Sequence, residues 1–308
     1  MSKIDYSKLS SNIELFAQQV VEGFITGKHK SPYHGFSVEF AEHRLYNEGE
    51  NTKHIDWKLY ARTDKLFNKR YEEETNLRCQ LVIDGSSSMY YPIIKNPNLE
   101  KPNKIVFSIY AAAVMMNLVK KQRDSIGLSV FTDKIEVHTP SKTTQRHHRI
   151  LYKELDKLLS NDIIKQSRLT NSTETLHQIC EMLHRRSLVM IFTDFIHPTT
   201  TLQDQFEAFK HMKYNKHEVV IFYIYESTTE MNLKFNNKPY EFIDIETKER
   251  LRLNPNLYKK KYQELTKSYL EELKSNCFKY KIDLVEVDIS QGFEKILNSY
   301  LLKRQKIF

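Results

Sequence analysis

The chain has 308 residues, enough for one large domain or two modest ones, and 40% of them are hydrophobic, which excludes a largely disordered protein. The net charge of +8 raises the question of nucleic-acid binding. However, the basic clusters at 259–261 and 303–306 are short and are not interleaved with aromatic residues, so we expect no nucleic-acid platform. An acidic protein partner would explain the charge equally well.

Targeting and redox signals favour a cytoplasmic protein. The longest uninterrupted apolar run, from Tyr110 to Met116, is much shorter than the ~20 residues that span a bilayer. The first residues lack the basic-then-apolar order of a secretory signal. The cysteines Cys79, Cys180 and Cys277 are odd in number and scattered, so a disulfide framework is not expected. We therefore expect a cytoplasmic protein without a transmembrane segment.

The predicted elements change in character at residue 77. Residues 1–30 carry apolar side chains at helical spacing, and residues 31–76 mix Pro, Gly, charged and aromatic residues. After that point, apolar strands alternate with amphipathic helices. The predicted strands are 79–83, 126–131, 135–138, 188–193, 219–225 and 282–287. The predicted helices are 103–121, 145–160, 173–185, 200–212, 255–278 and 291–303. This alternation predicts an α/β fold with a doubly wound, mostly parallel, six-stranded sheet flanked by helices.

We expect two parts along the chain. Residues 1–76 form an N-terminal helical and irregular extension that packs on the core, and residues 77–308 form the α/β domain. The alternation is broken at about 227–254, where two strand-like segments flank Asn236-Asn237-Lys238-Pro239. We expect a hairpin insertion there.

Two predicted strands end in an aspartate. The run Leu81-Val82-Ile83 leads into Asp84, with Ser86 and Ser88 at alternate positions, and a similar apolar run ends at Asp194. Because ligands of such sheets gather at the carboxyl ends of the strands, we expect both carboxylates at one edge. Carboxylate and hydroxyl oxygens suit a small divalent cation such as Mg²⁺.

The loop before the predicted helix 173–185 offers a third contributor. Residues 168–175 contain several hydroxyls, and a threonine there could donate to a metal site or to a metal-bound water. The simpler interpretation is that Thr170 and Thr173 only cap the helix.

The pattern of these residues resembles the metal-ion-dependent adhesion site (MIDAS) of von Willebrand factor type A domains, which share a Rossmann-like fold. The resemblance implies that Mg²⁺ or Mn²⁺ is bound by the set Asp84, Ser86, Ser88, Thr170 and Asp194. Thr173 and Thr175 stay open as alternatives to Thr170. An open coordination position would then accept a carboxylate from a protein partner. Phe195 stands where many type A domains have Gly, and we expect it to narrow the rim of the site.

An upstream block narrows the resemblance further. The segments 42–50, 55–58 and 61–63 are similar to the bacterial domain-of-unknown-function fifty-eight family, and the resemblance covers nearly the whole chain. Members of this family resemble partners of MoxR-type AAA+ ATPases, which implies a role in maturing other proteins or complexes.

The same block holds candidate docking residues. A docking surface or latch would use the set Arg44, Tyr46, Asp56, Trp57 and Arg62. The structural alternative, which we favour, pairs Asp56 with an arginine and packs Trp57 inside a small subdomain.

These patterns favour a non-enzymatic, metal-dependent protein-binding module. The alternative is a metal-dependent hydrolase or phosphatase that uses Asp84 or Ser86 as the nucleophile. An activated serine needs a base within hydrogen-bond reach, and no feature of the sequence assigns one. The chain has 7 glycines and neither a Walker loop nor a Gly-x-Gly-x-x-Gly motif, so we expect no nucleotide cofactor.

Overall fold

The chain folds into two compact units. The computed structural model describes residues 12–27, 40–46, 55–71, 77–160, 172–195, 201–245 and 247–307. The larger unit comprises residues 1–27 and 77–308, and the smaller unit comprises residues 28–76. Helix α1 (Ile13–Gly27), which the sequence analysis grouped with the 31–76 segment, thus belongs to the larger unit. Packing of that segment on the core stays a prediction.

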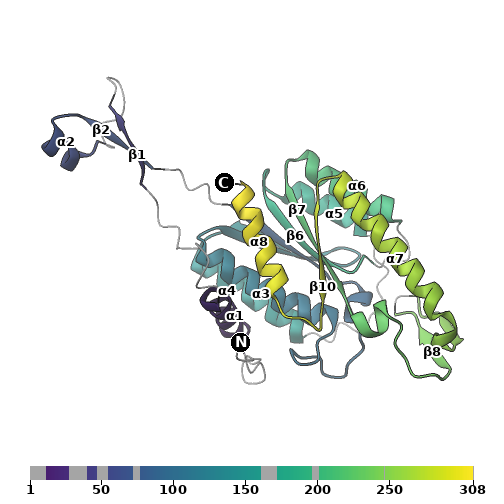
Figure 1. The fold of residues 1–308 in the computed structure, drawn as a ribbon. Coiled ribbons are helices and arrows are strands. Elements are labelled where there is room, and N and C mark those ends of the chain that lie inside the picture. The colour runs from purple at the N-terminus through teal and green to yellow at the C-terminus, as the bar shows by residue number, and fades with distance from the viewer. Residues whose placement is uncertain are drawn as a thin grey trace. The chain divides into compact units, whose positions relative to one another are not determined.

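A six-stranded, mostly parallel sheet with helices on both faces forms the centre of the larger unit, which confirms the predicted α/β class (Figure 1). In spatial order its strands are β10 (Asp283–Asp288), β7 (Glu218–Tyr225), β6 (Leu188–Thr193), β3 (Arg78–Asp84), β4 (Ser125–Phe131) and β5 (Ile135–Lys142). All neighbours pair in parallel except β4 and β5. Successive strands run outward from β3 to one side and from β6 to the other, so the strand order reverses between β3 and β6.

Alternating residues of the central strands enter two separate cores. In β6, Leu188, Met190 and Phe192 belong to the first core, whereas Val189 and Ile191 belong to the second. Both faces are therefore buried, which explains why this strand is apolar throughout. The helices of the first core are α1, α3 (Lys104–Lys121), α4 (Gln145–Ser160) and α8 (Glu294–Ile307). Those of the second core are α5 (Ser172–Met182), α6 (Leu202–Tyr214) and α7 (Pro255–Lys279).

Helix α3 is the most deeply buried helix of the first core. Every residue from Lys104 to Val119 is buried. Its start is fixed by Asn103, whose side-chain oxygen accepts a hydrogen bond from the backbone N–H of Val106. This cap places Lys104, a residue that is rarely buried, at the first position of an apolar helix.

Two further elements follow β7. A short π-helical turn, η5 (Ser227–Met231), comes first, and β8 (Tyr240–Ile243) then pairs antiparallel with β9 (Arg250–Leu253). The hairpin β8–β9 lies within the 227–254 segment that interrupts the strand–helix alternation. No helix in the described stretches combines the length and apolar character that a membrane crossing requires.

The smaller unit contains an antiparallel pair of strands, β1 (Phe40–Leu45) and β2 (Phe67–Tyr71), and the short helix α2 (Trp57–Thr63). Asp56 caps α2 by accepting hydrogen bonds from the backbone N–H groups of residues 58 and 59. The expectation that Trp57 is packed inside a subdomain is wrong, because its side chain is 61% exposed. The physical reason is that α2 carries no buried residue, so its face offers no core for the indole.

Candidate functional site

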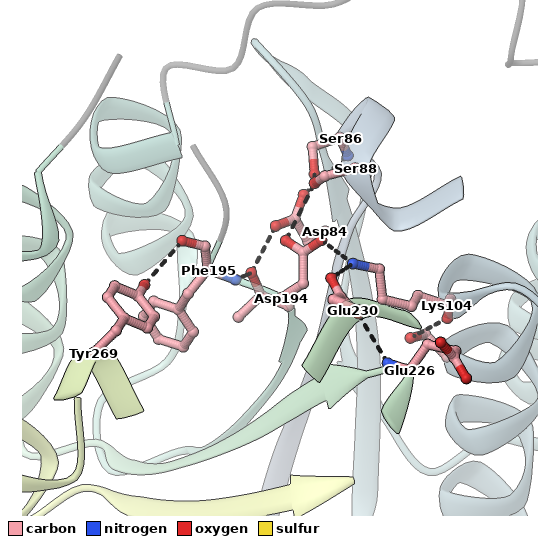
Figure 2. Close-up of polar contacts among 11 residues, drawn as sticks. Asp84, Ser86, Ser88, Lys104, Asp194, Phe195, Glu226, Glu230 and Tyr269 are labelled. Carbon is pink, nitrogen blue, oxygen red and sulfur yellow. Dashed lines mark hydrogen bonds and ion pairs between the residues drawn. The ribbon is translucent and has the colours of Figure 1, made fainter. Parts of the chain in front are cut away.

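Three neighbouring strands place acidic side chains at one edge of the sheet (Figure 2). Asp84 is the last residue of β3, Asp194 directly follows β6, and Glu230 lies in η5 just after β7. The first two side chains are buried, at 0% and 1% exposure. This edge includes the point where the strand order reverses, which is where sheets of this type bind ligands. The structure thus brings Asp84 and Asp194 together, although 109 residues separate the segments that carry them.

Neutral groups orient the Asp84 carboxylate. Its Oδ1 atom accepts a hydrogen bond of 2.9 Å from the backbone N–H of Ser86, and Oδ2 accepts one of 2.7 Å from the Thr193 hydroxyl. Gly85 allows the chain to pass close to the end of β4, since a Cβ at this position would lie 3.2 Å from the carbonyl oxygen of Phe131. These donors fix the position of the carboxylate without adding a positive charge.

The two predicted serine ligands connect the Asp84 loop to Asp194. The hydroxyl oxygens of Ser86 and Ser88 lie 3.0 Å apart, and the Ser88 hydroxyl donates to Asp194 Oδ1 at 3.2 Å. Both serines are buried where β3 leads into the short 3₁₀ helix η3 (Ser87–Tyr90). Four of the five side chains expected to bind a metal therefore lie within one hydrogen-bonded group.

Lys104 is the charged partner of Asp194, and sequence reasoning missed it. Its ammonium nitrogen lies 2.7 Å from Asp194 Oδ2 and 2.6 Å from Glu230 Oε1, with the side chain 1% exposed. Burial alone would lower the pKa of Lys104, but the two carboxylates outweigh this effect and raise the pKa above its ordinary value. The ammonium therefore remains charged, and it neutralises part of the acidic edge.

Glu230 is held in place by η5 and by contacts to other segments. Its Oε2 atom accepts a hydrogen bond of 2.8 Å from the backbone N–H of Glu226 (Figure 2). Its carbonyl oxygen accepts one of 2.7 Å from the hydroxyl of Tyr262 on α7. Beside it, Thr229 forms a hydrogen bond with the hydroxyl of Tyr91. Burial raises the pKa of Glu230, whereas the Lys104 ammonium acts in the opposite direction.

The candidate threonine ligands lie in the sequence at or just before the start of α5. Thr170 lies outside the described residues. Thr173, the alternative, has a buried hydroxyl without a hydrogen-bond partner in the described part of the chain. The neighbouring Thr175 hydroxyl donates to the carbonyl oxygen of Asp133, just beyond the carboxyl end of β4. Because β4 is next to β3, the first turn of α5 lies at the same sheet edge as Asp84.

The expectation that Phe195 narrows the rim of the site is wrong. Its side chain is 4% exposed and packs in the second core against Phe206, Phe209 and Tyr223. The backbone of Phe195 adopts a left-handed conformation with φ of 56°, which directs the ring toward α6. Its carbonyl oxygen accepts a hydrogen bond of 3.1 Å from the hydroxyl of Tyr269 (Figure 2).

The five candidate docking residues belong to the smaller unit. Arg44 is in β1 and its side chain lies outside the described part, while Tyr46 donates its backbone N–H to the carbonyl of Leu66. Trp57 packs edge-on against Tyr60 and is largely exposed, as is Arg62. Asp56 serves as the cap of α2. A docking role for these residues stays a prediction.

The oxygen donors at the sheet edge fit a small, hard cation. Asp84, Asp194 and Glu230 carry three negative charges when ionised and Lys104 carries one positive charge, so the group has a formal charge of −2, which a divalent ion would neutralise. No group of three or more His, Cys, Asp or Glu ligands is preformed among the described residues, so hydroxyls must supply the other donors. The serines can do so, and so can the Thr173 hydroxyl, which has no hydrogen-bond partner among the described residues.

Residues 42–271 match the family described as "Protein of unknown function DUF58". The chain belongs to this family. Relatives include the uncharacterized proteins Rv1480 of Mycobacterium tuberculosis and Mb1516 of Mycobacterium bovis, each 23% identical over 198 residues. The alignments cover 63% of this chain and 60% of each relative, so the chain spans less than two thirds of their length.

Two solved structures also align with the chain. One is the conserved hypothetical protein BatB from Bacteroides thetaiotaomicron, with 13% identity and a TM-score of 0.45 over 75% of this chain and 99% of that protein. The other is the PilB minor pilin from Streptococcus sanguinis, with 10% identity and a TM-score of 0.39 over 79% of this chain and 64% of the pilin.

Proposed function

We propose that this protein is a non-enzymatic module that binds another protein through a divalent cation, Mg²⁺ or Mn²⁺, at the carboxyl edge of its sheet. The ion would be held by Asp84, Ser86, Ser88 and Asp194, with a threonine hydroxyl from the start of α5. One observation carries the proposal: these four side chains, from two strands, converge where the strand order reverses.

The topology supports a von Willebrand factor type A-like domain. The order of the six strands, the single antiparallel strand β5 and the Asp-x-Ser-x-Ser pattern after β3 all resemble that class of domain and its MIDAS. By this resemblance, one coordination position faces the partner and accepts a carboxylate. Thr170 is the expected threonine ligand, and Thr173, whose buried hydroxyl has no hydrogen-bond partner among the residues that the structure describes, is a second candidate.

The donor set also supports binding rather than chemistry. Mg²⁺ prefers about six oxygen ligands, and this edge offers two carboxylates and three hydroxyls, so a partner carboxylate or water has a position to fill. The hydroxyl of Ser86 contacts the hydroxyl of Ser88 and no histidine in the described structure. We further propose, from the family resemblance, that the partner is a MoxR-type AAA+ ATPase and that the two act together in maturing a protein or complex.

The test is ion-dependent capture of that ATPase. Immobilised protein is incubated with the MoxR-type ATPase of the same organism, in Mg²⁺ or in excess chelator, and bound ATPase is quantified. We expect capture in Mg²⁺ only, and its loss in Asp84→Ala with an unchanged circular dichroism spectrum. Glu271→Ala, which removes an exposed carboxylate on α7, serves as the control and should capture normally. Equal capture in chelator, or by Asp84→Ala, would overturn the proposal.

A further inference from the structure

The buried ammonium of Lys104 contacts a carboxylate that the proposed function assigns to the metal. We propose that Lys104 is the resident cation of the site: it competes with the divalent ion for Asp194 and so sets the affinity of the site for that ion. This inference rests on the proposed function, since it concerns the same site.

The two oxygens of Asp194 have different partners. Oδ1 accepts a hydrogen bond from Ser88, on the side of the serine ligands, whereas Oδ2 is 2.7 Å from the Lys104 nitrogen. A cation that binds Asp194 must share this carboxylate with the ammonium. Two positive charges on one buried carboxylate repel each other strongly, because little water screens them. Lys104 therefore weakens ion binding and also stabilises Asp194 when the ion is absent.

Glu230 gives Lys104 a second partner. Its Oε1 atom is 2.6 Å from the ammonium, so Lys104 can release Asp194 without becoming an unpaired buried charge. The backbone of Lys104 is fixed as well, because its N–H donates to the carbonyl of Tyr91 and its carbonyl accepts from Ser108. Exchange of the ammonium for an ion thus requires only a small movement of the side chain.

This competition predicts opposite effects for two substitutions. Lys104→Met removes the competing charge and should raise the affinity for Mn²⁺ at least about tenfold. Glu230→Gln leaves Asp194 as the carboxylate that pairs with the ammonium. This substitution should therefore lower the affinity for Mn²⁺. The double variant Lys104→Met/Glu230→Gln keeps the formal charge of −2 but lacks the ammonium, so it should still bind Mn²⁺ more tightly than the wild type.

The experiment measures Mn²⁺ affinity by electron paramagnetic resonance of the free ion, together with thermal unfolding in chelator and in Mn²⁺. Lys104→Met should have a lower Tm in chelator and should regain most of that loss in Mn²⁺, because the ion replaces the ammonium. A lysine with a purely structural role would lower Tm equally in both conditions. Lys121→Met, which removes a partly exposed lysine from the same helix, should change neither value.

The outcomes separate this inference from the proposed function. If both Lys104→Met and the double variant bind Mn²⁺ no more tightly than the wild type, the inference is overturned, whereas the proposal of a metal site is unaffected. If Lys104→Met does not fold, the double variant, which lacks the uncompensated Glu230 charge, decides alone. Mn²⁺ binding by these variants but not by the wild type would support Lys104 as the resident cation and contradict the metal-dependent function. No binding by any form would overturn both.

Discussion

The two aspartates of the site stand at the ends of neighbouring strands but are held in different ways. Asp84 receives hydrogen bonds from a backbone N–H and a threonine hydroxyl, both of which are neutral donors. Asp194 receives a serine hydroxyl and the buried ammonium of Lys104, which it shares with Glu230. The two sides of the site thus differ in the donors that fix the carboxylate, since a backbone N–H and a hydroxyl hold Asp84, whereas an ammonium helps to hold Asp194. The β6–β7 side contributes a carboxylate that is already partly neutralised.

The largest expected difference between the two sides is in stability without metal. Asp194→Asn removes one partner of a buried ion pair and should lower the free energy of unfolding by about 3 kcal/mol, the lower end for such pairs, because Glu230 still holds Lys104. Asp84→Asn keeps one acceptor oxygen for the backbone N–H of Ser86, and the Thr193 hydroxyl can turn to accept from the new amide N–H, so this variant should cost only about 1 kcal/mol. Urea denaturation in excess chelator measures both values.

If Asp194→Asn and Asp84→Asn lose the same free energy of unfolding, the proposed difference between the two aspartates is wrong. Equal losses would mean that Asp84 depends on a charged partner as much as Asp194 does. A gain in stability for Asp84→Asn would instead sharpen the difference, because removing one of three neighbouring carboxylate charges relieves repulsion at the sheet edge.

A smaller effect is expected from the threonine hydroxyls of α5. Thr173→Val removes a buried hydroxyl that has no hydrogen-bond partner in the described structure, so stability should not fall. If that hydroxyl binds the ion, Mn²⁺ affinity should fall about tenfold, or 1.4 kcal/mol. Thr175→Val is the matched control, since its hydroxyl already contacts the carbonyl of Asp133. Calorimetric titration with Mn²⁺ compares the two, and an unchanged affinity for Thr173→Val would assign the ligand elsewhere.

The sequence predicted the elements that depend on local pattern. The helix expected at 145–160 and the strand expected at 188–193 match α4 and β6, because periodic burial determines both. The meeting of Asp84 and Asp194 could be predicted because each follows an apolar strand, and parallel strands end at a common edge. The pairing of Asp194 with a buried ammonium could not be predicted in this way.

Lys104, Phe195 and Trp57 show where local pattern is insufficient. Lys104 pairs with carboxylates 90 and 126 residues further along the chain, and its only local signal is a charge at the start of an apolar helix. The ring of Phe195 enters the core because of a left-handed backbone that a bulky residue rarely adopts. Trp57 is exposed because its short helix has no buried face, whereas its size alone favoured burial.

The affinity of the wild type and of Asp84→Asn for Mn²⁺, measured side by side by calorimetry, tests most directly whether the sheet edge is a cation site. Wild-type protein should bind one ion, and Asp84→Asn should bind at least about a hundredfold more weakly, since it loses one of the two buried carboxylates that are proposed to hold the ion. Equal affinities, or no binding by the wild type, would contradict a metal-dependent site built on Asp84 and Asp194.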